Sequence, residues 1–152
     1  MIRAVLFDLI GTLIYREKEV NTEELCRTLR LHNYQIYPQQ FDSARTFAFF
    51  IEYPKGNIRD EESFYKTVFK LLGYDVNDKI IDITTSYFHA NEKFRIFEDV
   101  KPCLRELKRK LCKTAIVTST PRFVFERNVK YLCLALLSVA LTTTIVGIFF
   151  KN

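Results

Sequence analysis

The feature that most constrains the fold is a short apolar run at the start of the chain, which ends in an aspartate. Residues 4–7 read AVLF, Asp8 follows them directly, and Gly11 interrupts the pattern three residues later. A continuous apolar run of this length is typical of a parallel strand that is buried on both faces. Asp8 is therefore expected where a buried strand leaves its sheet, the usual position of reactive groups in α/β sheets.

The stretch that follows has a helical pattern. From about residue 15 to residue 98, apolar residues recur at helical spacing, and helices are expected to begin near Asn21, Pro38, Asp60 and Asp78. This stretch is dense in Phe and Tyr, which are expected to form the core of a small helical bundle.

The pattern changes again after this stretch. A helix is expected from Pro102 through Leu111, a buried strand over 113–118, a helix from Pro121 to about residue 132, and a β-branched strand within 139–150.

The order of these elements predicts an α/β fold. Its core is a Rossmann-like parallel sheet, incomplete and of about three strands, formed by residues 1–14 and 99–152. Residues 15–98 are expected to form a helical cap inserted after the first strand.

Length and composition exclude several classes of protein. The chain has 152 residues, of which 48% are hydrophobic, and a net charge of +5, which together exclude a disordered chain. Lys and Arg are spread without a dense run, which argues against a nucleic-acid partner. The four cysteines lack CxxC spacing and no signal peptide opens the chain, so we expect no zinc site and a reducing, cytoplasmic setting.

The residues at the two expected strand ends suit nucleophilic chemistry on an anionic substrate. Asp8 can attack as a carboxylate, and Gly11 lets the backbone curl so that nearby N–H groups hold an anion. Thr118 offers a hydroxyl from the next strand, and Lys151 an ammonium group. In such a pocket Asp8 displaces a leaving group, and water then frees the resulting ester.

These residues resemble two motifs of the haloacid dehalogenase superfamily of hydrolases. Its first motif is an apolar strand followed by Asp-x-Asp-x-Thr, and residues 8–12 read DLIGT. Its second motif is an apolar strand ending in Thr or Ser, and residues 115–118 read AIVT. Residues 97–102, FEDVKP, are similar to the point where the family's chain returns to its core, so the resemblance runs from residue 2 to about residue 132.

The resemblance implies a hydrolase of small phosphorylated or halogenated molecules and assigns roles to single residues. Asp8 is then the nucleophile, Thr118 orients the transferring group with Ser119 beside it, and Thr12 supports the turn. Lys151 is at a plausible distance for the third motif of the family, although an ordinary terminal lysine explains it equally well.

One departure from the family concerns the position two residues after the nucleophile. Metal-dependent members bind Mg²⁺ through the first carboxylate and the main-chain carbonyl at this position, here Asp8 and Ile10. Phosphatases carry a second aspartate there, which protonates the leaving oxygen, and Ile10 cannot do so. This favours the dehalogenase branch, which needs no Mg²⁺, because a halide leaves without a proton. Arg45 is then the residue nominated to receive the halide, although a solvated helix-face arginine is the simpler interpretation.

A second departure is the end of the chain at Asn152. The family places two further strands beyond the third motif, one with an acidic motif, and without them the first strand lies at the edge of the sheet. We hypothesise a shortened family member ended by a frameshift, which reading the gene in its other frames would test. The open edge makes a homodimer a candidate assembly.

Two alternatives remain beside an active hydrolase. Residues 131–150 carry no charge and are long enough to span a bilayer, although the β-branched residues 142–146 favour a strand. A non-catalytic binding protein of the same fold is the other alternative, which Ile10 and the missing acidic motif favour.

Overall fold

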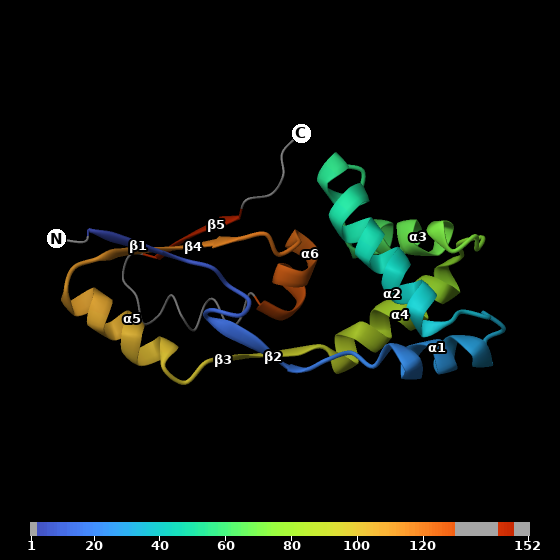
Figure 1. The fold of residues 1–152 in the computed structure, drawn as a ribbon, viewed down its shortest axis with the longest axis horizontal. Helices are drawn as coiled ribbons and strands as arrows, with labels where there is room; N and C mark the ends of the chain where they lie inside the picture. The colour runs from blue at the N-terminus through green and yellow to red at the C-terminus, as the bar shows by residue number, and fades with distance from the viewer. Residues whose placement is uncertain (1–2, 130–142, 148–152) are drawn as a thin grey trace. The chain divides into compact units, whose positions relative to one another are not determined.

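The chain folds into two compact units, each described here by itself. The structure is a computed structural model that describes residues 3–129 and 143–147. The first unit, called the α/β unit, comprises the described residues up to Lys18 and from Glu92 onward, and the second, called the helical unit, comprises Glu19–Asn91 (Figure 1).

The α/β unit is built on a parallel sheet, which confirms the predicted fold class. Strands β1 (Ala4–Phe7), β4 (Lys113–Thr118) and β5 (Thr143–Gly147) lie in the order β1-β4-β5, and both pairings are parallel (Figure 1). Helix α5 (Val100–Arg109) precedes β4 and so provides the crossover that a parallel sheet requires. Strand β4 has the predicted bounds, and β5 lies inside the predicted range 139–150.

Strand β1 occupies an edge of this sheet. Within the described residues it pairs with β4 alone, which agrees with the expected edge position. The expectation that it is buried on both faces is wrong, because Leu6 is 69% exposed whereas Phe7, on the opposite face, is partly buried. An apolar run thus predicts the position of the strand but not whether one or both of its faces are buried.

The core of the α/β unit lies on one face of the sheet. Its buried members come from the sheet, from the segment after β1 and from α5: Leu9, Leu13, Ile14, Phe94, Val100, Leu104 and Ile116. Helix α6 (Arg122–Val124) and the π-helical turn η3 (Phe125–Val129) follow β4 and add Val124 and Phe125 to this cluster. The expected end of that helix near residue 132 lies outside the described residues.

A two-stranded ribbon that the sequence did not predict flanks the helical unit in the sequence. Strands β2 (Ile14–Lys18) and β3 (Lys93–Ile96) pair in antiparallel orientation and belong to the α/β unit. The units therefore divide after Lys18 and before Glu92, whereas the sequence analysis placed the boundaries at residues 14 and 98. Strand β3, KFRI, alternates charged and apolar residues over only four positions, and β2, IYREK, has three charged residues in succession, so neither gives a strand signal strong enough to interrupt the helical pattern predicted for residues 15–98.

Four helices form the helical unit, and they begin where the sequence predicts. They are α1 (Thr22–Leu31), α2 (Pro38–Phe47), α3 (Glu61–Leu71) and α4 (Asp78–Asn91), with the short turns η1 (Ala48–Glu52) and η2 (Tyr53–Lys55) after α2. The Asn21 side chain accepts from the amide of Glu24 at 3.2 Å, and Asp60 accepts from the amide of Ser63 at 2.7 Å. These contacts satisfy amides that a helix start leaves without an internal partner.

Aromatic side chains fill the core of this bundle, as predicted. The Phe41 ring lies 5.9 Å from that of Phe69 and 6.5 Å from that of Phe88, and Tyr65 lies 5.3 Å from Phe88, measured between ring centroids. Such pairs stabilise a core beyond the area that they bury. Phe50, in contrast, is 67% exposed, so the aromatic content overstates the size of the core.

The thiol of Cys26 is expected to resist alkylation. It is fully buried in α1, and burial raises its pKa to about 11, so the reactive thiolate is scarce at pH 8. Cys103, exposed on α5, serves as the internal control. Iodoacetamide labelling at pH 8 followed by peptide mass spectrometry should modify Cys103 and spare Cys26 until denaturant is added. Equal labelling of the two residues in the native protein would contradict the buried position.

The apolar run 131–150 is only partly described. Strand β5 occupies residues 143–147 of it, and the remainder lies outside the described residues. Among the residues that the structure describes, no helix combines the length and the hydropathy needed to cross a bilayer.

Candidate active site

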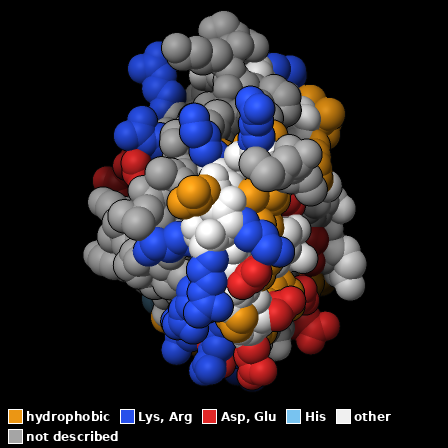
Figure 2. All heavy atoms as spheres, turned by 90° about the vertical axis from the view of Figure 1, so that its left-hand side faces the viewer, with side chains coloured by type: hydrophobic (Ala, Val, Ile, Leu, Met, Phe, Trp, Pro, Cys, Tyr) orange, Lys and Arg blue, Asp and Glu red, His pale blue; other side chains and the backbone are white. Residues whose placement is uncertain are grey.

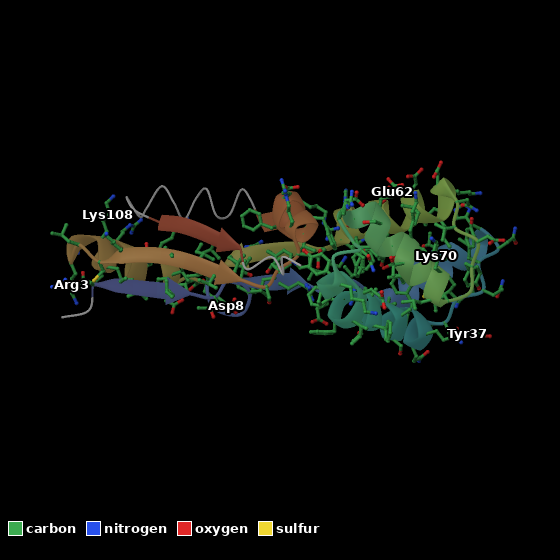
Figure 3. The ribbon with its side chains drawn as sticks, turned by 90° about the horizontal axis from the view of Figure 1, so that it is seen from above. Arg3, Asp8, Tyr37, Glu62, Lys70 and Lys108 are labelled. Atoms are coloured by element: carbon green, nitrogen blue, oxygen red, sulfur yellow. The ribbon has the colours of Figure 1, made fainter. Side chains whose placement is uncertain are left out.

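The structure brings the ends of the two motif strands to the same edge of the sheet. Asp8 follows the last residue of β1, and Thr118 is the last residue of β4 (Figure 3). Because β1 and β4 are parallel, with Phe7 opposite Ile116, both residues lie at the carboxyl ends of adjacent strands. Asp8 is exposed, although it lies between the partly buried Phe7 and the fully buried Leu9. The carboxylate is therefore presented to solvent from a backbone that is fixed on both sides.

A tight turn follows Asp8, and several of its backbone amides donate hydrogen bonds within the turn. The carbonyl of Leu9 accepts from the amides of Leu13 at 2.9 Å and Ile14 at 3.0 Å, and the amide of Gly11 donates to the carbonyl of Ile14 at 2.7 Å. Gly11 has a φ of +86°, which a residue with a side chain adopts only with strain. Thr12 lies exposed in this turn. Because these amides are engaged within the turn, they are not available to hold an anion beside Asp8.

The hydroxyl of Thr118 is fixed by a neighbour that the sequence analysis left without a role. Thr118 Oγ1 accepts from the amide of Thr120 at 3.1 Å and lies 2.7 Å from Thr120 Oγ1. Both threonines are buried, at 6% and 8% exposure, whereas Ser119 between them is exposed. In the sequence, Thr120 is noticeable only as part of the hydroxyl cluster at 118–120. Nothing there indicates that Thr120, and not Ser119, contacts Thr118.

Ile10 has a packing role in this structure. Its side chain is partly buried and packs against the apolar cluster that contains Leu9 and Leu13. This position thus carries a group that adds to the core and has no proton to exchange.

The residues nominated for Mg²⁺ do not make a sufficient site by themselves. Asp8 and the Ile10 carbonyl supply two of the six or so oxygen ligands that such an ion takes. In the part of the chain that the structure describes, no group of three or more His, Cys, Asp or Glu side chains converges as a metal site. We therefore derive no step through a metal ion.

The remaining nominated residues belong to the helical unit or lie outside the described residues. Arg45 belongs to α2 of the helical unit, where its guanidinium carbon lies 5.4 Å from the centroid of the Phe88 ring. This contact with the bundle's own core accounts for the side chain without a substrate. Lys151 lies outside the described residues.

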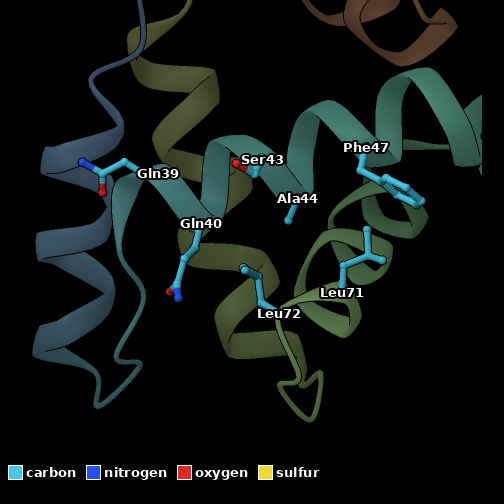
Figure 4. A pocket seen from close by; sticks show the side chains of 7 residues that line it. All are labelled: Gln39, Gln40, Ser43, Ala44, Phe47, Leu71 and Leu72. Atoms are coloured by element: carbon cyan, nitrogen blue, oxygen red, sulfur yellow. The ribbon is translucent and has the colours of Figure 1, made fainter.

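The helical unit carries a groove with a volume of about 610 Å³ (Figure 4). It lies between α2 and the end of α3 and is lined by Gln39, Gln40, Ser43, Ala44, Phe47, Leu71 and Leu72. None of these side chains is a nucleophile activated by a base or a charged group, so the groove lacks the components of a catalytic site.

A buried ion cluster in the α/β unit was also absent from the sequence analysis. Glu92, which is 7% exposed, contacts Arg16 at 3.1 Å and forms a second ion pair with Arg127. The Arg16 guanidinium carbon also lies 5.5 Å from the Phe94 ring centroid. Burial and the charge of Arg16 lower the pKa of Arg127 to about 10. The cluster joins β2, the residue before β3, and η3 through one carboxylate.

Comparisons with known proteins identify the family. No curated protein matches the chain. A solved dehalogenase with an intermediate complex is 17% identical, with 95% of this chain and 62% of that chain covered and a TM-score of 0.47. The L-2-haloacid dehalogenase from Xanthobacter autotrophicus with chloropropionic acid covalently bound is 15% identical, with 97% and 57% covered and a TM-score of 0.41.

The chain thus spans about three fifths of the length of these two solved proteins. The family model described as haloacid dehalogenase-like hydrolase matches residues 2–151, and this range includes both motif strands and the helical unit. Because that match covers nearly the whole sequence, the chain belongs to the haloacid dehalogenase-like hydrolase family.

Proposed function

We propose that the protein is a hydrolase in which Asp8 is the nucleophile and the substrate is a small molecule with a displaceable halide. The observation that carries the proposal is the exposed carboxylate at the carboxyl end of β1, held beside the end of β4 by the pairing of Phe7 with Ile116. Membership of a hydrolase family supports the same reaction class.

The proposed reaction has two steps. An oxygen of the Asp8 carboxylate attacks the carbon that bears the halogen, an ester bond forms, and the carbon–halogen bond breaks as the halide leaves with the electron pair. Water then attacks the carbonyl carbon of this ester. The alcohol product is released, the Asp8 carboxylate is restored, and one proton passes to solvent.

Ile10 is the reason to favour a halide over a phosphate ester. A phosphate ester expels an alkoxide, which needs a proton from a nearby acid, whereas a halide is stable as an anion. Ile10 packs into the apolar cluster and supplies no such acid. A phosphatase of this family would also use Mg²⁺, so phosphate release that depends on Mg²⁺ is the outcome that favours the alternative substrate class.

The position of an isotope label tests the mechanism. The protein is incubated with 2-chloropropionate in water enriched in ¹⁸O at low substrate-to-enzyme ratio, and the peptide containing Asp8 is analysed by mass spectrometry. We expect chloride release and ¹⁸O in Asp8, because water attacks the ester at the aspartyl carbon. Chloride release with an unlabelled Asp8 would contradict the nucleophile assignment. Absence of both chloride release and Mg²⁺-dependent phosphate release would favour a non-catalytic binding protein.

A further inference from the structure

The fold places Arg3 beside a local cluster of cations, in residues 108–113, at one end of the α/β unit. Arg3 precedes β1, Lys113 begins β4, and the carbonyl of Arg3 accepts from the amide of Lys113 at 3.0 Å. Lys108 and Arg109 end α5, and Lys110 follows them. Arg3 and Lys108 are labelled at the same end in Figure 3, opposite the end of β1 that carries Asp8. We call these five residues, together with Leu111, the basic end.

The positive charge of the basic end is largely uncompensated. Among the described residues, Arg109 and Lys110 form ion pairs with Glu106, at 3.7 and 3.5 Å, and both share that one exposed carboxylate. Five cations against one carboxylate leave a net charge of about +4 on this face. Figure 2 shows blue Lys and Arg side chains clustered on this side of the molecule. A charge of this size attracts anionic surfaces over roughly a Debye length, about 10 Å at moderate salt.

Leu111 is an exposed leucine among these basic side chains. Leu111 is 89% exposed and has a φ of +54°, in the turn where α5 ends. The amide of Leu111 donates to the carbonyl of Lys108, and that of Cys112 to the carbonyl of Leu107, both at 3.0 Å. This is the helix-ending turn in which glycine is preferred, because a side chain strains the left-handed backbone. The position thus carries a large apolar side chain that neither the core nor the turn requires.

We propose that the basic end is a docking surface for an anionic phospholipid bilayer, with Leu111 entering the boundary between headgroups and acyl chains. Basic side chains around a projecting apolar group match a lipid surface, which offers phosphates above hydrocarbon. An aliphatic side chain has no planar face on which a nucleotide base could stack, which makes a single-stranded nucleic acid the poorer match. The proposal concerns a face other than the Asp8 edge and does not depend on the proposed function.

Co-sedimentation with lipid vesicles tests the proposal on the full chain. Vesicles of phosphatidylcholine with about one third phosphatidylserine are compared with vesicles of pure phosphatidylcholine at low salt. We expect binding to the anionic vesicles that falls as salt is raised. The double variant Lys108→Gln/Lys110→Gln is expected to weaken this binding by about tenfold or more.

The variant Leu111→Gly separates insertion from folding. Glycine suits the positive φ, so the variant is expected to fold at least as stably as the wild type while its vesicle binding weakens by about tenfold. Lys70→Gln/Lys79→Gln, on exposed lysines of the helical unit, removes the same charge and is expected to retain binding. Equal binding to neutral vesicles, equal loss in this control, unchanged binding of Leu111→Gly, or binding to single-stranded RNA without binding to anionic vesicles would each overturn the proposal.

Discussion

Replacement of Asp8 with asparagine is expected to reduce kcat for halide release by roughly 10⁴–10⁶-fold, the range seen when a hydrolase loses its covalent nucleophile. The amide has nearly the shape of the carboxylate but cannot form the ester. Asp8 is exposed and lies outside the apolar cluster, so the substitution is expected to leave folding intact. Chloride release under saturating 2-chloropropionate, measured with wild type and variant at equal folded concentration, checks this expectation.

Asp82→Asn is a suitable control because it makes the same chemical change on an exposed position of α4, in the helical unit. We expect its kcat to match that of the wild type. If Asp8→Asn retained a rate within tenfold of the wild type, Asp8 would not be the nucleophile. If both variants lost activity together, the effect would be one of charge or folding.

Replacement of Glu92 with alanine is expected to lower the free energy of unfolding by about 3–5 kcal/mol, the usual effect of removing one partner from a buried ion pair. The substitution leaves Arg127, whose side chain is 10% exposed, beside Arg16 with no carboxylate between them. Arg16 is 39% exposed and can be solvated, whereas Arg127 is not, so the main loss is the ion pair of the buried Arg127 with Glu92.

Urea unfolding followed by circular dichroism measures this loss. Glu106→Ala, which breaks exposed ion pairs of Arg109 and Lys110, is expected to change the free energy of unfolding by less than about 1 kcal/mol. Adding Arg127→Met to Glu92→Ala removes the buried charge and is expected to restore part of the stability. A Glu92→Ala variant as stable as Glu106→Ala, or a double variant less stable than Glu92→Ala, would contradict the proposed role of the cluster.

Local signals in the sequence predict the helices and the sheet strands well. Asn21, Asp60 and Pro38 mark helix starts through caps and a fixed backbone angle, which depend only on neighbouring residues. The run at 113–118 predicts β4 because its apolar residues and its flanking breakers are adjacent in the chain. Asp8 and Thr118 could be placed at one edge of the sheet because the order of elements predicts parallel strands.

The ribbon β2–β3 could not be predicted in the same way. Its strands are short, and β2 has three consecutive charged residues instead of a period-two pattern. The two strands pair although the whole helical unit separates them in the sequence, so only the distant partner distinguishes them from helix. The apolar spacing predicts a helix from Pro102 through Leu111, yet α5 ends at Arg109 and the backbone reverses at Leu111. Spacing alone does not locate a helix end where the residue in the left-handed position is not glycine.

Long-range charge contacts were missed for a related reason. Arg16, Glu92 and Arg127 are far apart in the sequence, and none stands in a motif, so their cluster exists only through the fold. The basic end depends on the fold only in part, where Arg3 joins residues more than 100 positions later. Four of its cations stand together in residues 108–113, KRKLCK, so the reading of Lys and Arg as evenly spread missed this local cluster, and only Arg3 joins it through the fold.

The pairing of β1 with β4 also sets the order in which the protein can assemble during translation. Ala4 pairs with Lys113, 109 positions away, whereas the helical unit is formed by one contiguous stretch. Local contacts close with a smaller loss of chain entropy than distant ones, so the bundle is able to form on the ribosome first. Until residue 118 has emerged from the ribosome, β1 has no strand to pair with and exposes apolar side chains such as Leu6. We expect chaperones to bind the nascent chain mainly during this interval.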